Sequence, residues 1–304
     1  MDLDQLRAFI NVVALKSFSG AADRMYISQP SVSMRIKTLE RELGLALFDR
    51  SKAREPVLTE SGQIFLDFAQ AVINLEDELK NKLSTRKEEA AGMVSVGAST
   101  VPGTYLLPSI LAAFKKIYPA VDFKINILDT GAVLEGIQNY EYDLGFVGSC
   151  REDEKIAYLP LVEDELVLCT PAGLYKNTAC RDGGIPLEDI FSENLLMREQ
   201  GSATRQFLEK KLAEKDLGLD KFTSITYFNN LEGIKKAIVA GLGIAVLSKM
   251  SVSDTADAGS IDIYPIRELD MRRLLYLVCH RRRIPSLAVR LFRDYITKKY
   301  SLKE

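Results

Sequence analysis

The chain has 304 residues, of which 47% are apolar and 27% charged, and its formal net charge is −2. This composition is typical of a globular protein, and the length predicts about two domains. No apolar run approaches the roughly 20 residues that a membrane helix needs, and Met1-Asp2 does not begin a signal peptide. We therefore expect a cytoplasmic protein without a membrane partner.

Cysteine and histidine, which serve as metal ligands and catalytic residues, are sparse. The four cysteines form no C-x-x-C pair, which suits a reducing compartment and argues against a zinc or iron–sulfur site. The cysteines are Cys150, Cys169, Cys180 and Cys279. The one histidine, His280, ends an apolar run beside three arginines, so it fits a strand end better than a catalyst. We predict that the protein is not an enzyme, that it has no catalytic residue, and that it binds no metal ion or cofactor.

Residues 1–43 predict three helices. In the first, apolar residues recur at helical spacing and should pack beneath the other two. They are Leu3, Leu6, Phe9, Ile10 and Val13. The second helix is predicted to be capped by Ser19 and to end near Tyr26. Ser28 is predicted to cap the third helix, whose first turn holds Pro30, where the missing N–H costs nothing.

The third helix has one buried stripe and one polar face. The stripe is formed by Val32, Ile36, Leu39 and Leu43, and Gly44 is predicted to end the helix. Leu45, Leu47 and Phe48 are then expected to return to the core. On the polar face, Gln and Arg suit base edges of the major groove, and Ser and Lys suit phosphates. The candidate DNA contacts are Gln29, Pro30, Ser31, Ser33, Met34, Arg35 and Lys37, of which we favour Gln29, Ser33, Arg35 and Lys37.

An ordinary helical hairpin with a solvated face would show the same pattern, and charge favours the DNA interpretation. From Arg24 to Arg54 there are seven Lys/Arg and three Asp/Glu, although the whole chain is slightly acidic. A local positive patch points to an acidic partner bound at one place. The basic segment 50–56 then predicts a hairpin wing, in which Lys52 and Arg54 can reach phosphates or a minor groove. A solvated loop is the alternative for this segment.

Several motifs follow one another almost without gaps: L-x-x-F, SFS-x-AA, SQPSVS, I-K-x-LE-x-ELG-x-x-LF-x-R and LTE-x-G. Over residues 1 to about 65 the chain therefore resembles the winged helix-turn-helix of LysR-type transcriptional regulators. Met34 departs from the family pattern, in which this position is often polar or basic. The resemblance implies double-stranded DNA as a partner.

Residues 59–83 predict one long helix with a coiled-coil-like seam. The seam is formed by Phe65, Phe68, Val72, Leu75 and Leu79. Such a seam needs a partner helix, and the resemblance implies that this helix pairs two protomers. We expect a homodimer or a homotetramer.

From Gly92 onward, strands alternate with helices, which predicts a parallel α/β sheet in two lobes. The predicted strands are 93–99, 121–128, 144–147, 159–170, 195–197, 223–228, 244–247, 261–266 and 274–279. The predicted helices are 105–118, 132–140, 202–217, 231–240 and 285–300. The resemblance implies an effector domain like a periplasmic binding protein, with the first lobe completed by the C-terminal segment.

Turns from a strand into a helix are the candidate ligand sites, because free N–H groups and the helix dipole favour anions there. The candidates are Ser99, Thr100, Thr130, Gly201, Ser202, Thr204 and Asn230. Plain helix capping is the alternative for each of them. Arg198 and Arg205 can pair with an anion, or with Glu199 or a neighbouring loop.

We predict a multidomain protein: a winged helix-turn-helix at 1–58, a linker helix and hinge at 59–91, and an effector-binding domain at 92–304. Lobe I covers about 92–163 and 268–304, and lobe II about 164–267. The predicted function is sequence-specific transcriptional regulation controlled by a small-molecule effector, an oxyanion or a carboxylate, between the lobes. The rivals are an enzyme, disfavoured by missing nucleophile and phosphate-loop motifs, and a transport protein, disfavoured by the DNA-binding segment.

Overall fold

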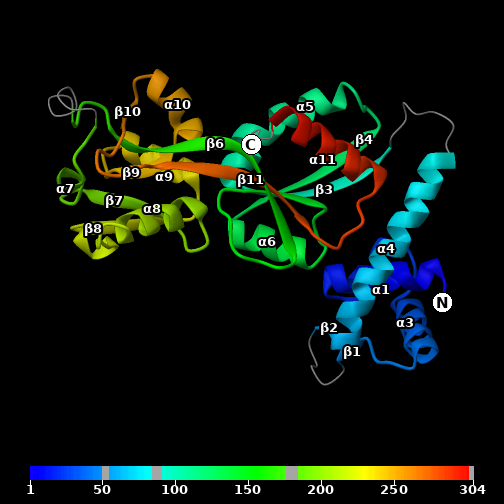
Figure 1. The fold of residues 1–304 in the computed structure, drawn as a ribbon. Helices are drawn as coiled ribbons and strands as arrows, with labels where there is room; N and C mark the ends of the chain where they lie inside the picture. The colour runs from blue at the N-terminus through cyan, green and yellow to red at the C-terminus, as the bar shows by residue number, and fades with distance from the viewer. Residues whose placement is uncertain (50–54, 84–90, 176–183, 301–304) are drawn as a thin grey trace.

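A computed structural model describes residues 1–49, 55–83, 91–175 and 184–300. Figure 1 shows a small helical head, a long helix that leaves it, and two α/β lobes connected by two long strands. Lys52 and Arg54, predicted to lie at the tip of the wing, fall outside the described residues.

The head consists of three helices and a short hairpin. They are α1 (Leu3–Leu15), α2 (Phe18–Met25), α3 (Gln29–Leu43), β1 (Phe48–Asp49) and β2 (Val57–Leu58). Ser28 caps α3 through the N–H of Ser31, and Gly44 ends it in the left-handed conformation with φ of 67°, as predicted. The strands β1 and β2 pair antiparallel, as the stem of a wing requires.

Two local predictions in the head were wrong. Ser17 rather than Ser19 caps α2, by accepting from the N–H of Gly20. The helix begins earlier because Phe18 is part of it and its ring packs 5.7 Å from that of Phe48. Leu45 does not return to the core; it is 54% exposed, whereas Leu47 is buried.

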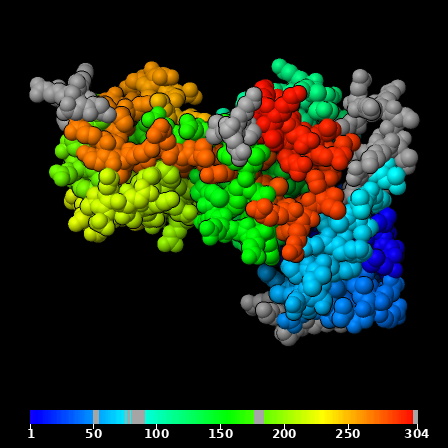
Figure 2. All heavy atoms as spheres, viewed as in Figure 1, coloured from blue at the N-terminus to red at the C-terminus, as the bar shows by residue number. Residues whose placement is uncertain are grey.

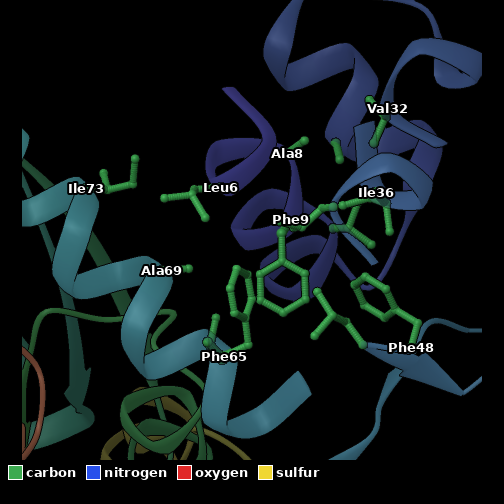
Figure 3. Close-up of a cluster of buried hydrophobic side chains, with 14 of the residues drawn as sticks. Leu6, Ala8, Phe9, Val32, Ile36, Phe48, Phe65, Ala69 and Ile73 are labelled. Carbon is green, nitrogen blue, oxygen red and sulfur yellow. The ribbon is translucent and has the colours of Figure 1, made fainter. Parts of the chain in front are cut away.

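Two aromatic side chains, Phe48 and Phe65, pack against Phe9 in the core of the head (Figure 3). The ring of Phe9 lies 5.4 Å from the ring of Phe48 and 5.2 Å from the ring of Phe65. Phe65 belongs to α4 (Glu60–Leu83), so this long helix completes the core of the head.

The predicted seam on α4 is therefore divided between two faces. Phe65 and Val72 pack against the head, while three other members of the seam are exposed. Among the α4 side chains whose burial the structure describes, the exposed large apolar ones are Ile64, Phe68, Leu75 and Leu79.

Lobe I is built on strands β3, β4 and β5, together with parts of two long strands, β6 and β11. The bounds are β3 (Gly92–Ser99), β4 (Val121–Leu128), β5 (Leu144–Val147), β6 (Ile156–Pro171) and β11 (Arg272–His280). Helices α5 (Leu107–Lys115) and α11 (Leu287–Tyr300) share one buried cluster with β3, and α6 (Thr130–Gln138) shares another with β5 and β11. The helical path into α5 starts at Thr100 and includes a π-helical turn, η1 (Pro102–Leu106), so it begins before the predicted Tyr105.

Lobe II contains the remaining elements. They are α7 (Leu187–Ile190), β7 (Asn194–Arg198), α8 (Ala203–Ala213), η2 (Leu219–Lys221), β8 (Ser224–Phe228), α9 (Leu231–Val239), β9 (Ala245–Ser248), α10 (Lys249–Asp257) and β10 (Ile261–Tyr264). The sequence prediction missed α7 and α10. Two buried clusters form its core, one under α8 and one under α9.

The sheet is mixed rather than parallel. Its strand order is β10-β6-β11-β5-β3-β4, with β9 also paired to β6. Within this sheet the pairs β3–β4 and β3–β5 are parallel, but β11–β5, β11–β6, β10–β6 and β9–β6 are antiparallel. The strands β7 and β8 form a separate two-stranded parallel sheet. The prediction of a parallel sheet was wrong because the order of strands and helices along the chain does not specify the direction in which β6 and β11 run relative to their neighbours. Figure 1 shows β6 and β11 running between the two lobes, and Figure 2 shows the head beside lobe I.

We expect Phe9→Ala to lower the free energy of unfolding of the head by about 3–5 kcal/mol, because a fully buried aromatic residue leaves a cavity. Urea denaturation of the full chain, followed by circular dichroism, measures the change. Leu45→Ala, at an exposed apolar position, is the control and should cost less than about 0.5 kcal/mol. A loss below about 1 kcal/mol for Phe9→Ala would contradict this account of the core.

Candidate DNA interface and effector site

Helix α3 presents its polar face to solvent, because its apolar stripe is buried against α1 and α2. Val32, Ile36 and Leu39 are buried. Opposite them, Gln29, Pro30, Ser31, Met34 and Lys37 are exposed, and Ser33 and Arg35 are half-buried. All seven candidate DNA contacts of this helix are thus at least partly exposed.

Several of these side chains are held by neighbours. The amide of Gln29 donates to the hydroxyl of Ser33 over 3.0 Å. The guanidinium of Arg35 lies 3.1 Å from a carboxylate oxygen of Asp4, and both side chains are partly exposed. Such a solvated pair contributes at most about 1 kcal/mol, so phosphate or base contacts can replace it.

Sequence reasoning did not include Tyr26 among the DNA contacts. This residue joins α2 to α3 in the left-handed conformation, with φ of 55°, and it is 95% exposed. An exposed aromatic residue in a strained turn beside Ser28 and Gln29 is a further candidate contact. The only feature of the sequence that could have indicated Tyr26 as a DNA contact is its position between the two helices.

A polar pocket lies between the lobes. Its volume is about 20 Å³, which accommodates about one water-sized group. Lobe I contributes the ends of β3, β4 and β5, and lobe II contributes the turn from β7 into α8. Its lining includes Ser99, Thr100, Asp129, Thr130, Gly148, Arg198, Ser202, Thr204 and Arg273.

The hydrogen bonds of each candidate side chain show whether it caps a helix or has a polar group left for a ligand. Ser202 stands at the N-cap position of α8 but makes no capping hydrogen bond. The hydroxyl of Thr130 is buried and has no partner among the described residues. Asp129, by contrast, caps α6 through the N–H of Ala132. A buried donor without a partner is costly, so Thr130 has a hydroxyl suited to a ligand.

The two candidates outside the pocket lining have structural roles. Asn230 caps α9, because its side-chain oxygen accepts from the N–H of Gly233 over 2.6 Å. Gly201 has φ of 94°, and a Cβ there would lie 2.9 Å from a carboxylate oxygen of Asp129. Glycine is therefore required at this turn for backbone and packing reasons.

Arg198 pairs with Glu199, which was one of its predicted alternatives, and it also lines the polar pocket. Its guanidinium donates to Glu199 over 2.7 and 2.8 Å and approaches the hydroxyl of Thr100 at 3.5 Å. Arg205 is turned away from the pocket, toward Glu209 and over the ring of Tyr227. Arg198 of lobe II thus contacts Thr100, the residue that follows β3 in lobe I.

Arg273 is the main residue that sequence reasoning missed. It is buried on β11 and pairs with Asp164 on β6, with nitrogen–oxygen distances of 2.8 and 2.9 Å. Asp164 also accepts from the hydroxyl of Ser248 over 2.6 Å. A third nitrogen of Arg273, Nη1, lies 3.3 Å from the hydroxyl of Thr204 in the pocket. Burial lowers the pKa of Arg273, and the charge of Asp164 opposes that shift.

Within the described ranges, no helix is both long and apolar enough to cross a membrane. The same residues contain no group of three or more His, Cys, Asp or Glu side chains placed to hold a metal ion.

Two family models match the chain. The model of the LysR substrate binding domain matches residues 87–301, and that of the bacterial regulatory helix-turn-helix protein, lysR family, matches residues 3–63. A probable RuBisCO transcriptional regulator of Cyanophora paradoxa is 30% identical over 304 residues, which cover 99% of this chain and 93% of that protein. An uncharacterised HTH-type transcriptional regulator of Methanocaldococcus jannaschii is 32% identical, with 97% and 98% covered.

Solved structures share the fold. Full-length OxyR of Pseudomonas aeruginosa, a single-site variant, superposes with a TM-score of 0.75 at 22% identity and covers 100% of this chain and 99% of its own. The regulatory domain of CcmR from Synechocystis, in complex with 2-PG, gives a TM-score of 0.59 at 24% identity, covering 68% of this chain and 96% of its own. With both family models matched and the whole fold shared, the chain belongs to the LysR family: it is a DNA-binding transcriptional regulator with an effector-binding domain, and not an enzyme.

Proposed function

We propose that α3 recognises a specific DNA sequence through Gln29, Ser33, Arg35 and Lys37. The observation that carries this proposal is the exposed polar face of α3 above a buried apolar stripe. Pro30, Ser31 and Met34 border that face, and we keep Lys52 and Arg54 as proposed wing contacts. Because its target is DNA, we also propose that the protein acts in the cytoplasm.

We expect Arg35→Ala to weaken binding to an operator selected from random duplexes by about 1–3 kcal/mol, as loss of one base contact does. Lys37→Ala should lower the slope of log affinity against log salt by about one, as loss of one phosphate contact does. Fluorescence anisotropy at several salt concentrations measures both changes. Lys115→Ala, which removes an exposed charge from the effector domain, is the control. Normal affinity in folded Arg35→Ala would remove Arg35 from the interface.

We propose that the polar pocket binds the anionic group of a small-molecule effector, with Ser99, Thr100, Thr130, Ser202 and Thr204 as hydroxyl donors. The pocket collects several hydroxyls and the Nη1 of Arg273 between the lobes, and the buried hydroxyl of Thr130 has no partner among the described residues. The 2-PG complex of CcmR and the shikimate complex of the QuiR effector-binding domain support a small-molecule ligand in this domain. An effector that binds one arrangement of the lobes more tightly shifts their equilibrium toward that arrangement.

This proposal includes the boundaries given by the sequence: a head at 1–58, a linker at 59–91, lobe I at about 92–163 and 268–304, and lobe II between them. It is supported by β6, whose residues belong to the buried clusters of both lobes: Leu161 to that of lobe I, and Leu166 and Leu168 to one of lobe II. The strand β11 is paired to β6 along its length. These two strands are the connection about which the lobes would open.

We expect Thr100→Ala to weaken effector binding by about 1.5–3 kcal/mol, because a hydrogen bond to a charged group is lost, and to leave operator affinity without effector unchanged. A thermal-shift screen of the full chain against sulfate, phosphate and organic acids identifies a ligand. Saturation at about a hundred times the dissociation constant adds about 2.7 kcal/mol of stability. Ser109→Ala removes an exposed hydroxyl from α5 and is the control. If every ligand binds Thr100→Ala as tightly as the original protein, the site lies elsewhere.

We propose a homodimer held by α4, which can pair further into a tetramer. Ile64, Phe68, Leu75 and Leu79 are 69%, 47%, 53% and 56% exposed and lie on the same helix. A run of large apolar side chains on one exposed helix favours a protein partner, and a second copy of α4 has the complementary surface.

We expect the double variant Leu75→Asp/Leu79→Asp to halve the mass of the particle, because two buried charges per helix oppose pairing. Light scattering after size exclusion gives the mass. Leu45→Asp, which adds the same charge to an exposed leucine of the head, is the control and should keep the original mass. An unchanged mass for the double variant would show that α4 does not hold the protomers together.

A further inference from the structure

A second, larger cavity adjoins the polar pocket. Its volume is about 390 Å³, within the range of small-molecule sites. It shares three lining residues with the polar pocket: Gly148 at the end of β5, Ala203 at the start of α8, and Arg273 on β11. The polar pocket and the larger cavity therefore lie on either side of one contact between the lobes, that of Gly148 with Ala203.

That contact is narrow and made by small residues. A Cβ added at Gly148 would lie 3.2 Å from the Cβ of Ala203 and 3.4 Å from Nη1 of Arg273. Because Gly148 belongs to lobe I and Ala203 to lobe II, a slight separation of the lobes joins the polar pocket and the larger cavity into one crevice. Nη1 of Arg273 lies at the junction, since its other two nitrogens are bound by Asp164.

The large cavity is lined by both apolar and polar side chains, and the charged side chains among them are positive. Phe207 of α8 and Leu274 of β11 provide apolar surface. Lys210 is exposed at the rim and makes no ion pair with any described residue. The hydroxyl of Ser149 is buried without a partner among the described residues. No Asp or Glu is among the described residues that line this cavity, so its charge favours an anion.

The volumes of the polar pocket and the larger cavity determine which part of a ligand each can hold. The polar pocket accommodates about one water-sized group, so it can take the charged end of an organic acid but not its carbon body. The neighbouring cavity has the volume and the apolar surface that the body needs. Lys210, seven residues after Ala203 on α8, offers a second positive group in the lining of this cavity.

We propose that the effector is an organic dianion: one anionic group binds in the polar pocket, the carbon body packs against Phe207 and Leu274, and the second anionic group binds Lys210. This inference rests on the proposed function, and it makes the larger cavity a second part of the same binding site. An inorganic anion would occupy the polar pocket alone.

The test compares matched acids by thermal shift and calorimetry on the full chain. Succinate, adipate and phthalate are each measured beside the monocarboxylate of similar shape, namely butyrate, hexanoate or benzoate, and sulfate is measured as the inorganic anion. We expect at least one diacid to bind tenfold or more tightly than its monoacid and to displace sulfate.

Lys210→Gln should remove that tenfold difference and leave the monoacid and sulfate affinities unchanged. Leu274→Trp, which fills the cavity, should weaken both organic acids and spare sulfate. Lys215→Gln makes the same charge change beyond the end of α8 and should alter nothing.

The outcomes separate the two proposals. If sulfate binds and Thr100→Ala weakens it, but no diacid exceeds its monoacid, the dianion proposal is wrong and the polar pocket stands. If a diacid is favoured but Lys210→Gln keeps the full difference, Lys210 does not bind the second group and the proposal is also wrong. If Thr100→Ala leaves every affinity unchanged, the proposed function itself fails.

Discussion

The buried ion pair between Arg273 and Asp164 is the interaction on which the effector domain depends. The two residues face each other across β11 and β6, the strands that connect the lobes. Asp164 also receives the hydroxyl of Ser248, and Arg273 reaches Thr204. Removing one partner would leave a buried charge uncompensated, which typically costs about 3–5 kcal/mol. The same pair therefore holds the hinge together and positions a positive nitrogen between the lobes.

The polar pocket depends on this hinge because its walls come from both lobes. Hydroxyls at the ends of β3 and β7 face each other only while β6 and β11 hold the lobes at their present separation. Arg198 adds a second connection, from lobe II to Thr100 of lobe I. A ligand that replaces or strengthens these connections changes the balance between open and closed lobes, which is how binding energy becomes a change of conformation.

The head is attached to lobe I through α4 and a small aromatic cluster. The hydroxyl of Tyr140, in the turn after α6, donates to the carboxylate of Asp67 on α4. The ring of Tyr140 lies 4.4 Å from that of His280, and Arg283 donates to the carbonyl of Tyr140 over 3.0 Å. Burial lowers the pKa of His280, so at neutral pH the ring packs in its uncharged form. A movement of lobe I relative to α4 must therefore move or break this contact.

The sequence by itself determined the local elements and the family. Caps such as Ser28 and Gly44, the apolar stripe of α3, and most strands from β3 onward follow from residue order within a few positions. Tertiary packing decided the remainder. Phe18 packs on Phe48, and α2 therefore begins earlier than predicted. Phe65 packs on Phe9 in the core of the head, so it is not available to a partner helix as the predicted seam required. The pair Arg273–Asp164 joins residues far apart in the chain, and only the register of β11 against β6 brings them opposite each other. Local patterns specify which backbone conformation a segment prefers, whereas charge pairs, cavities and strand directions depend on which segments meet.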